Sequence, residues 1–166
     1  ASEEFQKESI KAELETLKNH LDPHFLFNNL NILSSLISKD QKLSQSYLEK
    51  FAEVYRMILQ SSSEEVVELR QELDFISAYM YLLEIRFEDT IQLQMDIKPE
   101  NHQYYLPPLT LQMLIENAIK HNAISEIRPL QIHIECRDGY VVVKNNLQAK
   151  RVESRNSSKT GLDNIK

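Results

Sequence analysis

Apolar residues recur every three or four positions through the first half of the chain, the spacing that places them on one face of an α-helix. This pattern favours helix over residues 2–38, with an interruption at Pro23, because proline lacks an amide donor and its ring crowds the preceding turn. A polar break over residues 38–44 precedes a second amphipathic helix. Its apolar positions run from Leu48 to Leu59, and it ends in the serines at 61–63.

A third helix is predicted to begin near Glu68. Its apolar positions are spaced alternately by four and three residues, which is the seam of helices that pack side by side. These positions are Leu69, Leu73, Ile76, Met80, Leu83 and Phe87. We expect this seam to pair with another helix, between two copies of the chain.

The pattern changes at Ile91, from which apolar and polar residues alternate as far as Ile97 and predict a half-buried strand. Pro107–Pro108 then precedes apolar positions at helical spacing, so we predict a helix with proline in its first turn. A second alternating run leads into Asp138–Gly139, a two-residue turn signal, and a β-run over 140–143 completes a predicted β-hairpin. Residues 148–160 are polar without periodicity and predict a loop.

Charge and composition narrow the classes of function. The net charge of −6 and the pI near 5.4 argue against a nucleic-acid-binding surface, so no nucleic acid is expected as partner. The single cysteine, Cys136, cannot form an internal disulfide and indicates a reducing compartment. No apolar run approaches the roughly 20 residues needed to cross a bilayer, so we expect these residues to be soluble. With only two glycines, the chain has no glycine-rich phosphate loop.

The segment Asp-Pro-His-Phe-Leu-Phe-Asn-Asn-Leu-Asn, residues 22–31, is the first candidate for chemistry. An isolated helical histidine is usually a surface or core residue without function. Phosphoryl transfer to histidine requires a neutral ring nitrogen free to attack, with the other nitrogen held by a polar group, and Asn28 lies one turn after His24. We expect the flanking Phe25, Leu26 and Phe27 to be core residues that leave the ring of His24 pointing outward.

The string Pro-His-Phe-Leu-Phe-Asn followed by Leu-Asn resembles the phosphoacceptor motif of LytS-type sensor histidine kinases. The resemblance implies that His24 is phosphorylated from ATP and passes the phosphoryl group to an aspartate of a response regulator. By its position four residues after the histidine, Asn28 also resembles a residue that other kinase families use to dephosphorylate the regulator.

The second candidate is the helix that contains Glu-Asn-Ala-Ile-Lys-His, residues 116–121. Asn117, Lys120 and His121 lie within one turn, where an amide oxygen can complete a Mg²⁺ shell and a lysine can meet phosphate charge. A polar helix surface with cations near the C-terminus is the plainer interpretation of the spacing. The string closely resembles the N box of the histidine-kinase and Hsp90-like ATPase superfamily. The resemblance implies that Asn117 binds Mg²⁺, that Lys120 and His121 help to bind ATP, and that Glu116 orients a group or accepts a proton.

Two further segments resemble nucleotide-binding boxes of that superfamily less closely. Where the family has Asp-x-Gly-x-Gly, this chain has Asn-Asn-Leu-Gln-Ala, in which Asn145 is the candidate acceptor for the adenine amino group. The glycines that shape this loop are absent. The segment at 157–164 resembles the second glycine box, so Thr160, Gly161 and Leu162 are candidate phosphate contacts.

The fold class expected from the patterns and the resemblance is α+β. A helical dimerisation and phosphoacceptor region, residues 1–66, leads into an ATP-binding α/β sandwich, residues 67–166, which we expect to be incomplete at its C-terminus. A hinge is expected over residues 87–90. The chain is expected to be a homodimer and the cytoplasmic part of a sensor in the cell (inner) membrane, with its membrane segments upstream.

Two alternatives remain open at the level of the sequence, and a third is rejected. The changed adenine box is compatible with a pseudokinase that scaffolds a dimer or binds a regulator without ATP turnover. His20 and His24 are four residues apart, but we expect no zinc site there, because Leu21 stands where a metalloprotease needs its glutamate and Pro23 distorts the face between the two histidines. Either Glu116 or Asp22 can serve as the general base, because Phe25 stands where many histidine kinases have an acidic residue.

Overall fold

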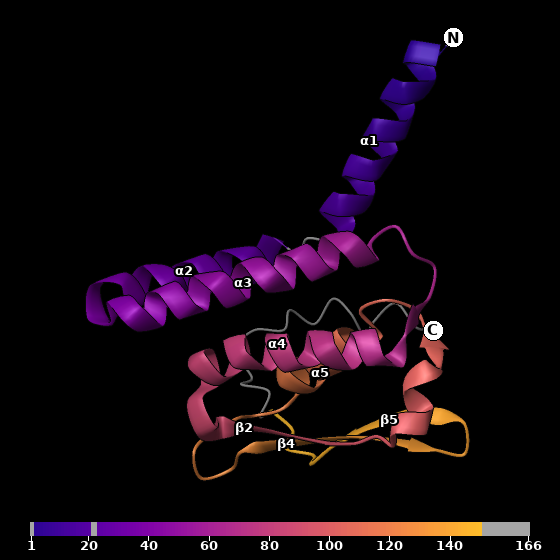
Figure 1. Ribbon diagram of the computed structural model, residues 1–166. Helices are drawn as coiled ribbons and strands as arrows, with labels where there is room; N and C mark the ends of the chain where they lie inside the picture. Colours follow the sequence, from indigo (N-terminus) through magenta and orange to yellow (C-terminus); the bar gives the residue numbers. More distant parts are fainter. Residues whose placement is uncertain (1, 21–22, 151–166) are drawn as a thin grey trace, which may run out of the picture.

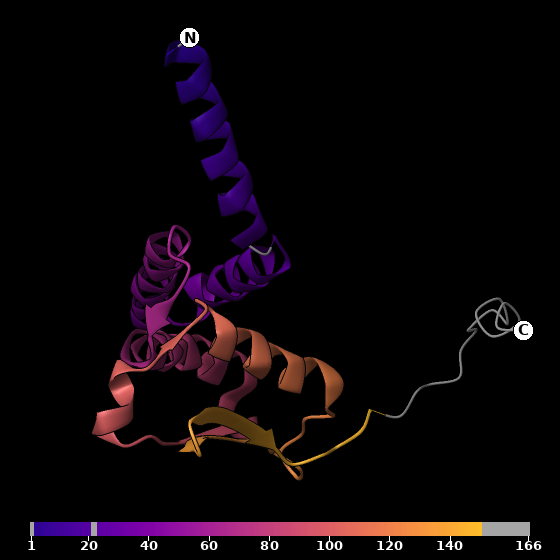
Figure 2. The same ribbon diagram turned by 90° about the vertical axis from the view of Figure 1, so that its right-hand side faces the viewer.

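The computed structural model describes the backbone of residues 2–20 and 23–150 and the side chains of residues 2–12 and 24–150. Apart from helix α1, Ser2–His20, the described chain forms three layers (Figure 1). The pair α2, Pro23–Lys39, and α3, Gln41–Ser61, lies on a layer formed by α4, Leu69–Phe87, and α5, Thr110–His121. A sheet forms the third layer, and α1 extends away from all three (Figure 2).

The N-terminal helices follow the predicted pattern with one shift in a boundary. α1 ends at His20 and α2 begins at Pro23, as the predicted interruption at Pro23 requires. The polar break predicted over residues 38–44 is confined to Asp40, and α3 already begins at Gln41. The cause is a cap, because the Asp40 carboxylate accepts a hydrogen bond from the Leu43 amide at 3.0 Å and satisfies one of the donors at the helix start.

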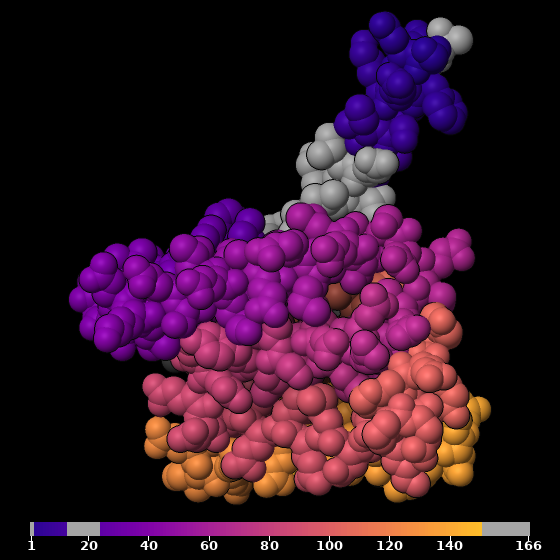
Figure 3. Space-filling view, in the orientation of Figure 1, coloured from indigo at the N-terminus to yellow at the C-terminus, as the bar shows by residue number. Residues whose placement is uncertain are grey.

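Helix α4 is buried within the chain, and our prediction that its seam pairs two copies was wrong. The seam residues from Leu69 to Leu83 are buried, and Phe87 is partly buried against the same core. They contact α3 on one side and α5 on the other, and the space-filling view shows α3 lying directly on α4 (Figure 3). A seam at helical spacing indicates that a helix is buried but does not identify what covers it.

The sheet has the order β2–β4–β5, from strands Ile91–Asp96, Leu130–Arg137 and Tyr140–Asn145. β2 pairs with β4 in parallel, and β4 with β5 antiparallel through the predicted turn, where Asp138 and Gly139 have φ of 52° and 80°. Inward side chains of β4 are buried beneath α5, whereas its outward positions are polar. Two 3₁₀ helices, η1, Glu88–Thr90, and η2, Pro99–Gln103, flank β2, and β1, Val67–Glu68, pairs with β3, Tyr105–Leu106.

The start of α5 differs from the prediction of proline in the first turn. α5 begins at Thr110, two residues after Pro108, and Leu109 before it has φ of 62°. The first amide is satisfied by a distant carboxylate, because the Thr110 N–H donates to Oε1 of Glu72 on α4 at 2.8 Å. A buried acidic side chain therefore holds the N-terminus of α5 against α4.

The predicted α+β class is confirmed, with a helical region followed by an α/β sandwich. The division of the chain at residue 67 and hinge motion over residues 87–90 stay predictions, although α4 does end at Phe87. None of the helices among the described residues is both long and apolar enough to cross a membrane.

Candidate functional site

A cavity of about 710 Å³ lies between α2, the end of α4 and α5, and we call it the acceptor cavity. Its size is within the range of small-molecule sites. Its lining combines residues from both sequence motifs. These residues are His24, Phe25, Asn28, Arg86, Phe87, Glu116, Asn117, Ile119, Lys120, Asn122, Ile124 and Lys150.

His24 is exposed and is held on one side by its own helix. Nδ2 of Asn28 lies 3.2 Å from Nδ1 of His24, within hydrogen-bond distance. As placed, the amide nitrogen of Asn28 faces Nδ1, and a half-turn of the amide presents its oxygen to a protonated Nδ1 instead. In the second arrangement, Nε2 carries the lone pair that phosphoryl transfer needs.

The residues beside His24 anchor α2 in the core. Phe25 is buried, and its ring centroid lies 5.7 Å from that of Tyr79 on α4. The buried Asn29 donates to the Phe25 carbonyl at 2.8 Å and accepts a hydrogen bond from the Tyr47 hydroxyl of α3. The prediction of a core Phe25 beside an outward His24 is confirmed, whereas Phe27 is 63% exposed, so its assignment to the core was wrong. Two positions apart, Phe25 and Phe27 lie on different faces of the helix.

Three polar residues of α5 line the acceptor cavity: Glu116, Asn117 and Lys120. Lys120 lies one turn after Glu116, near the C-terminal end of the helix. His121, which we grouped with them from the sequence, is exposed and is absent from the lining. At about 100° per residue, Glu116, Asn117 and Lys120 span roughly 100° of the helix surface, and His121 falls about 40° beyond Asn117, outside that arc.

The charge of the lining favours an anionic ligand. Arg86, Lys120 and Lys150 contribute positive charge and Glu116 contributes negative charge. This balance contrasts with the net charge of −6 of the whole chain. Cationic side chains gathered around a cavity raise the local concentration of an anion such as a polyphosphate.

The structure adds residues that the sequence analysis missed. Glu116 accepts a hydrogen bond from the hydroxyl of Tyr79 on α4, and Arg86 from the same helix reaches the cavity. Glu72, Tyr79 and Arg86 are spaced by seven residues, so they share one face of α4. The sequence carried a signal for them, because these polar residues repeat every seven positions within a helix whose other positions are largely apolar.

Asn122, also missed, closes the cavity at the end of α5. It is buried, and its Nδ2 donates to the Ala118 carbonyl while its Oδ1 accepts from the Gln148 amide, both at 2.8 Å. The Ala123 amide donates to the Gln148 carbonyl at 2.7 Å. These bonds fix the segment that leads to Lys150 beside the cavity.

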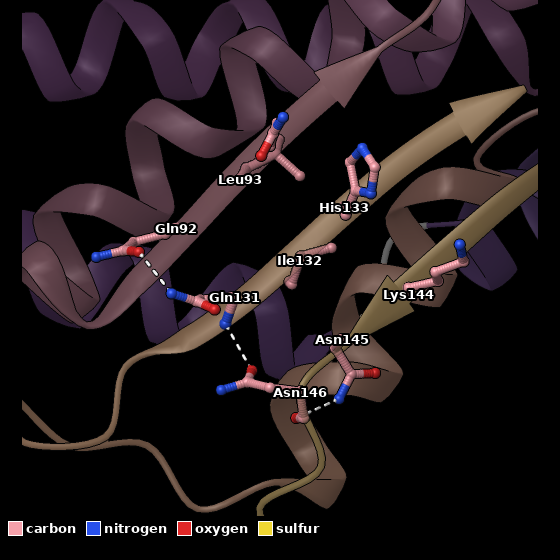
Figure 4. Close-up of a pocket in the computed structure, with 9 residues that line it drawn as sticks. Gln92, Leu93, Gln131, Ile132, His133, Lys144, Asn145 and Asn146 are labelled. Atoms are coloured by element: carbon pink, nitrogen blue, oxygen red, sulfur yellow. Dashed lines mark hydrogen bonds between the residues drawn. The ribbon is translucent and has the colours of Figure 1, made fainter.

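Asn145, the candidate adenine contact, lies outside the lining of the acceptor cavity. It ends β5 opposite Ile132, and its Nδ2 donates to the Asn146 carbonyl at 2.8 Å. It lines a second cavity, of about 370 Å³, which Gln92, Gln131 and Lys144 also line (Figure 4). The other nucleotide candidates, Thr160, Gly161 and Leu162, lie outside the described residues, as does Asp22.

Within the described part of the chain, no group of three or more His, Cys, Asp or Glu side chains is placed to hold a metal ion. The side chain of His20 lies outside that part, so the expectation that His20 and His24 form no metal site stays a prediction. A Mg²⁺ ion that arrives with ATP needs fewer protein ligands, because it binds through one or two protein oxygens together with phosphates and water. Asn117 offers such an oxygen in the acceptor cavity, beside cationic residues.

Comparisons with known proteins identify the family of this chain. The family model described as histidine kinase matches residues 12–91. The chain is 31% identical over 170 residues to the sensor protein LytS of Bacillus cereus, covering 93% of this chain and 29% of that protein. It is 38% identical over 121 residues to the sensor protein LytS of Streptococcus agalactiae, covering 72% of this chain and 20% of that protein.

A third relative is the sensor protein kinase HptS of Staphylococcus aureus, 34% identical over 122 residues, which covers 74% of this chain and 23% of that protein. The chain thus spans less than a third of the length of each of these relatives. These matches show that the chain belongs to the histidine kinase family and is similar to its LytS-type sensor proteins.

Proposed function

We propose that this chain is the kinase region of a two-component sensor histidine kinase that phosphorylates His24 from ATP. The observation that carries the proposal is the acceptor cavity, which His24 lines together with Asn117 and Lys120. These residues come from segments almost a hundred positions apart in the sequence. A phosphoryl donor bound at α5 would therefore share one cavity with the imidazole.

The reaction is a nucleophilic displacement at the γ-phosphorus of ATP. Nε2 of His24 attacks, the N–P bond forms, and the bond from phosphorus to the bridging oxygen breaks, so that ADP leaves with the electron pair. The proton on Nδ1 then passes to a base. Glu116, which lines the cavity, and Asp22 are the two candidates.

In the second step, a carboxylate oxygen of an aspartate in a response regulator attacks the same phosphorus. The N–P bond of phosphorylated His24 breaks, and the imidazole recovers its electron pair. His24 is exposed, which suits contact with a partner protein once ADP has left. Asn28, beside the ring, is the residue we propose for positioning water during regulator dephosphorylation.

Different side chains of this chain are proposed to contact different parts of Mg-ATP. We propose that Asn117 contributes the protein oxygen of a Mg²⁺ site, that Lys120 contacts phosphate, and that His121 and Asn145 contact the nucleotide from outside the cavity lining. When bound, Mg²⁺ neutralises the charge that develops on the phosphate oxygens. Thr160, Gly161 and Leu162 complete the proposed site.

We further propose that the protein is a homodimer and that this region lies on the cytoplasmic side of a membrane sensor, joined to its membrane segments through α1. Support for dimerisation comes from large apolar side chains exposed on the outer faces of α2 and α3. They are Phe27, Leu30 and Ile37 on α2 and Leu48 and Leu59 on α3. Exposed apolar residues at such spacing mark a surface for helix pairing.

Incubation with γ-labelled ATP and Mg²⁺ tests the proposed reaction. We expect acid-labile label on the full-length protein, none on His24→Gln, and normal labelling of His102→Gln, a control on η2 that lines neither cavity. Label retained in His24→Gln would contradict the assignment. A folded protein that neither binds nor turns over ATP would instead be the non-enzymatic scaffold.

A further inference from the structure

We propose that Tyr79 is a positioning residue that sets the acceptor helix α2 against the nucleotide helix α5. The inference rests on the proposed function for its consequence in catalysis, and on contacts within the molecule for its physical basis. Tyr79 lies on α4, the helix between the α2–α3 pair and the sheet, and its side chain is 0% exposed.

The ring of Tyr79 contacts α2. Its centroid lies 5.7 Å from that of Phe25, at an interplanar angle of 39°. On its own helix, the ring stacks on Phe75 at 6.0 Å and 12°. Aromatic pairs at these separations contribute beyond the area that they bury. The Tyr79 ring therefore helps to hold Phe25 in position, together with the ring of Tyr55 on α3 at 6.0 Å.

The hydroxyl of the same side chain contacts α5, because it donates a hydrogen bond to Oε1 of Glu116. A buried hydroxyl is costly unless it is hydrogen-bonded, and Glu116 provides the acceptor. Glu116 is only partly buried and also lines the acceptor cavity. The bond therefore connects the interior of the molecule to the edge of the cavity.

The two contacts of Tyr79 are adjacent in sequence to the two central residues of the proposed site. Phe25 follows His24, and Glu116 precedes Asn117. One side chain thus joins the immediate neighbours of the phosphate acceptor and of the proposed Mg²⁺ ligand. Reacting atoms must approach to about 3–3.5 Å, and a misplacement of about 1 Å costs roughly a hundredfold in rate. Loss of this connection should therefore lower the rate of phosphoryl transfer more than it weakens the binding of Mg-ATP.

Tyr79→Phe distinguishes the role of the hydroxyl from that of the ring, because it keeps the aromatic contact and removes only the bond to Glu116. The matched control is Ser77→Ala, which removes another side-chain hydroxyl of α4, bonded to the Leu73 carbonyl of the same helix and absent from the cavity lining. A general effect of losing a hydroxyl from this helix would appear in both variants. An effect on alignment would appear only in Tyr79→Phe.

The kinetic test uses two phosphoryl donors on the full-length protein. For Tyr79→Phe we expect kcat for labelling by ATP to fall about tenfold, the cost of a shift of roughly half an ångström, with KM for Mg-ATP within about twofold. Phosphoramidate needs no nucleotide site, so its labelling of His24 should stay within about twofold of the wild type. Ser77→Ala should keep the kcat of the wild type. An unchanged kcat in Tyr79→Phe, or an equal loss with phosphoramidate, would overturn the proposal.

A distance measurement tests the alignment without relying on kinase activity. Spin labels are placed on exposed positions, Ser35→Cys on α2 and Met113→Cys on α5, in protein whose other cysteines, Cys136 among them, are replaced by serine. Dilution with unlabelled protein leaves one labelled chain per dimer. Pulsed dipolar spectroscopy should give a narrow distance distribution in the wild type and Ser77→Ala, and a shifted or broadened one in Tyr79→Phe.

An unchanged distribution in Tyr79→Phe would overturn the positioning role whatever the kinase assay gives. Conversely, if ATP fails to label the wild type while the distribution changes as expected, the proposed reaction is wrong and the positioning role of Tyr79 stands. The two hypotheses therefore fail through different observations.

Discussion

Replacing Glu72 with glutamine probes how the nucleotide helix α5 is held. The Glu72 side chain is 2% exposed, and its Oε1 accepts the Thr110 N–H at 2.8 Å at the start of α5. Burial raises the pKa of this carboxyl from 4.5 to about 6, against the lowering effect of hydrogen bonds from the backbone around Thr110. Glutamine keeps an oxygen that can accept the same bond but carries no charge at any pH.

The direction of the effect on stability follows from this raised pKa. The folded state favours the protonated carboxyl, so the contribution of Glu72 to stability is fully present below pH 4.5 and is lost as the pH rises through about 6. At about 1.4 kcal/mol per pH unit, the difference between the two pKa values corresponds to about 2 kcal/mol. Between pH 4.5 and 7.5, wild type should therefore lose about 2 kcal/mol of unfolding free energy relative to Glu72→Gln.

Urea unfolding of both proteins at a series of pH values measures this difference directly. Glu84→Gln, on an exposed position of the same helix, is the matched control, and its difference from wild type should vary little with pH. A wild-type to Glu72→Gln difference that stays constant from pH 4.5 to 7.5 would refute the argument. A difference that grows in favour of wild type as the pH rises would show that the charged carboxylate stabilises the cap.

Three further substitutions test other parts of the account. Ile115→Ala removes a fully buried side chain of α5 and should lower the unfolding free energy by about 2–5 kcal/mol in urea titrations, whereas a loss below about 1 kcal/mol would contradict the packing. Asp40→Ala removes the cap of α3 and should cost about 1 kcal/mol in the same assay, with no loss expected if the Leu43 bond is unimportant. Asn117→Ala should weaken Mg-ATP binding in calorimetry while Asn31→Ala, exposed on α2, should not, and equal affinities would remove Asn117 from the proposed site.

Much of the secondary structure could be predicted from periodicity alone. The helices α3 and α4, the strand β2 and the hairpin β4–β5 agree with patterns that depend only on nearby residues. What covers α4 could not be predicted in this way, because a seam records burial and not the identity of the neighbour. The start of α5 was likewise misassigned, since its cap comes from Glu72, far away in the sequence.

For the candidate site, the sequence predicted the residues that lie within motifs, whereas the other residues of the cavity could be identified only from the fold. His24, Asn117 and Lys120 line one cavity, but nothing local connects either motif to Tyr79. Asn145 stands at a strand end, where the following loop decides which way a side chain reaches, and here it bonds to the carbonyl of Asn146. Long-range contacts and loop conformation are the parts that periodicity and spacing do not specify.

The most direct test of the account is to locate the phosphate itself. Full-length protein incubated with Mg-ATP is digested at neutral or mildly basic pH, where phosphohistidine survives, and the phosphopeptides are sequenced by mass spectrometry. We predict a single acid-labile phosphate on His24, absent when Asn117 is replaced by alanine. Phosphate on another residue, with His24 unmodified in protein that binds Mg-ATP, would contradict the claim that this histidine receives the phosphoryl group from a nucleotide at α5.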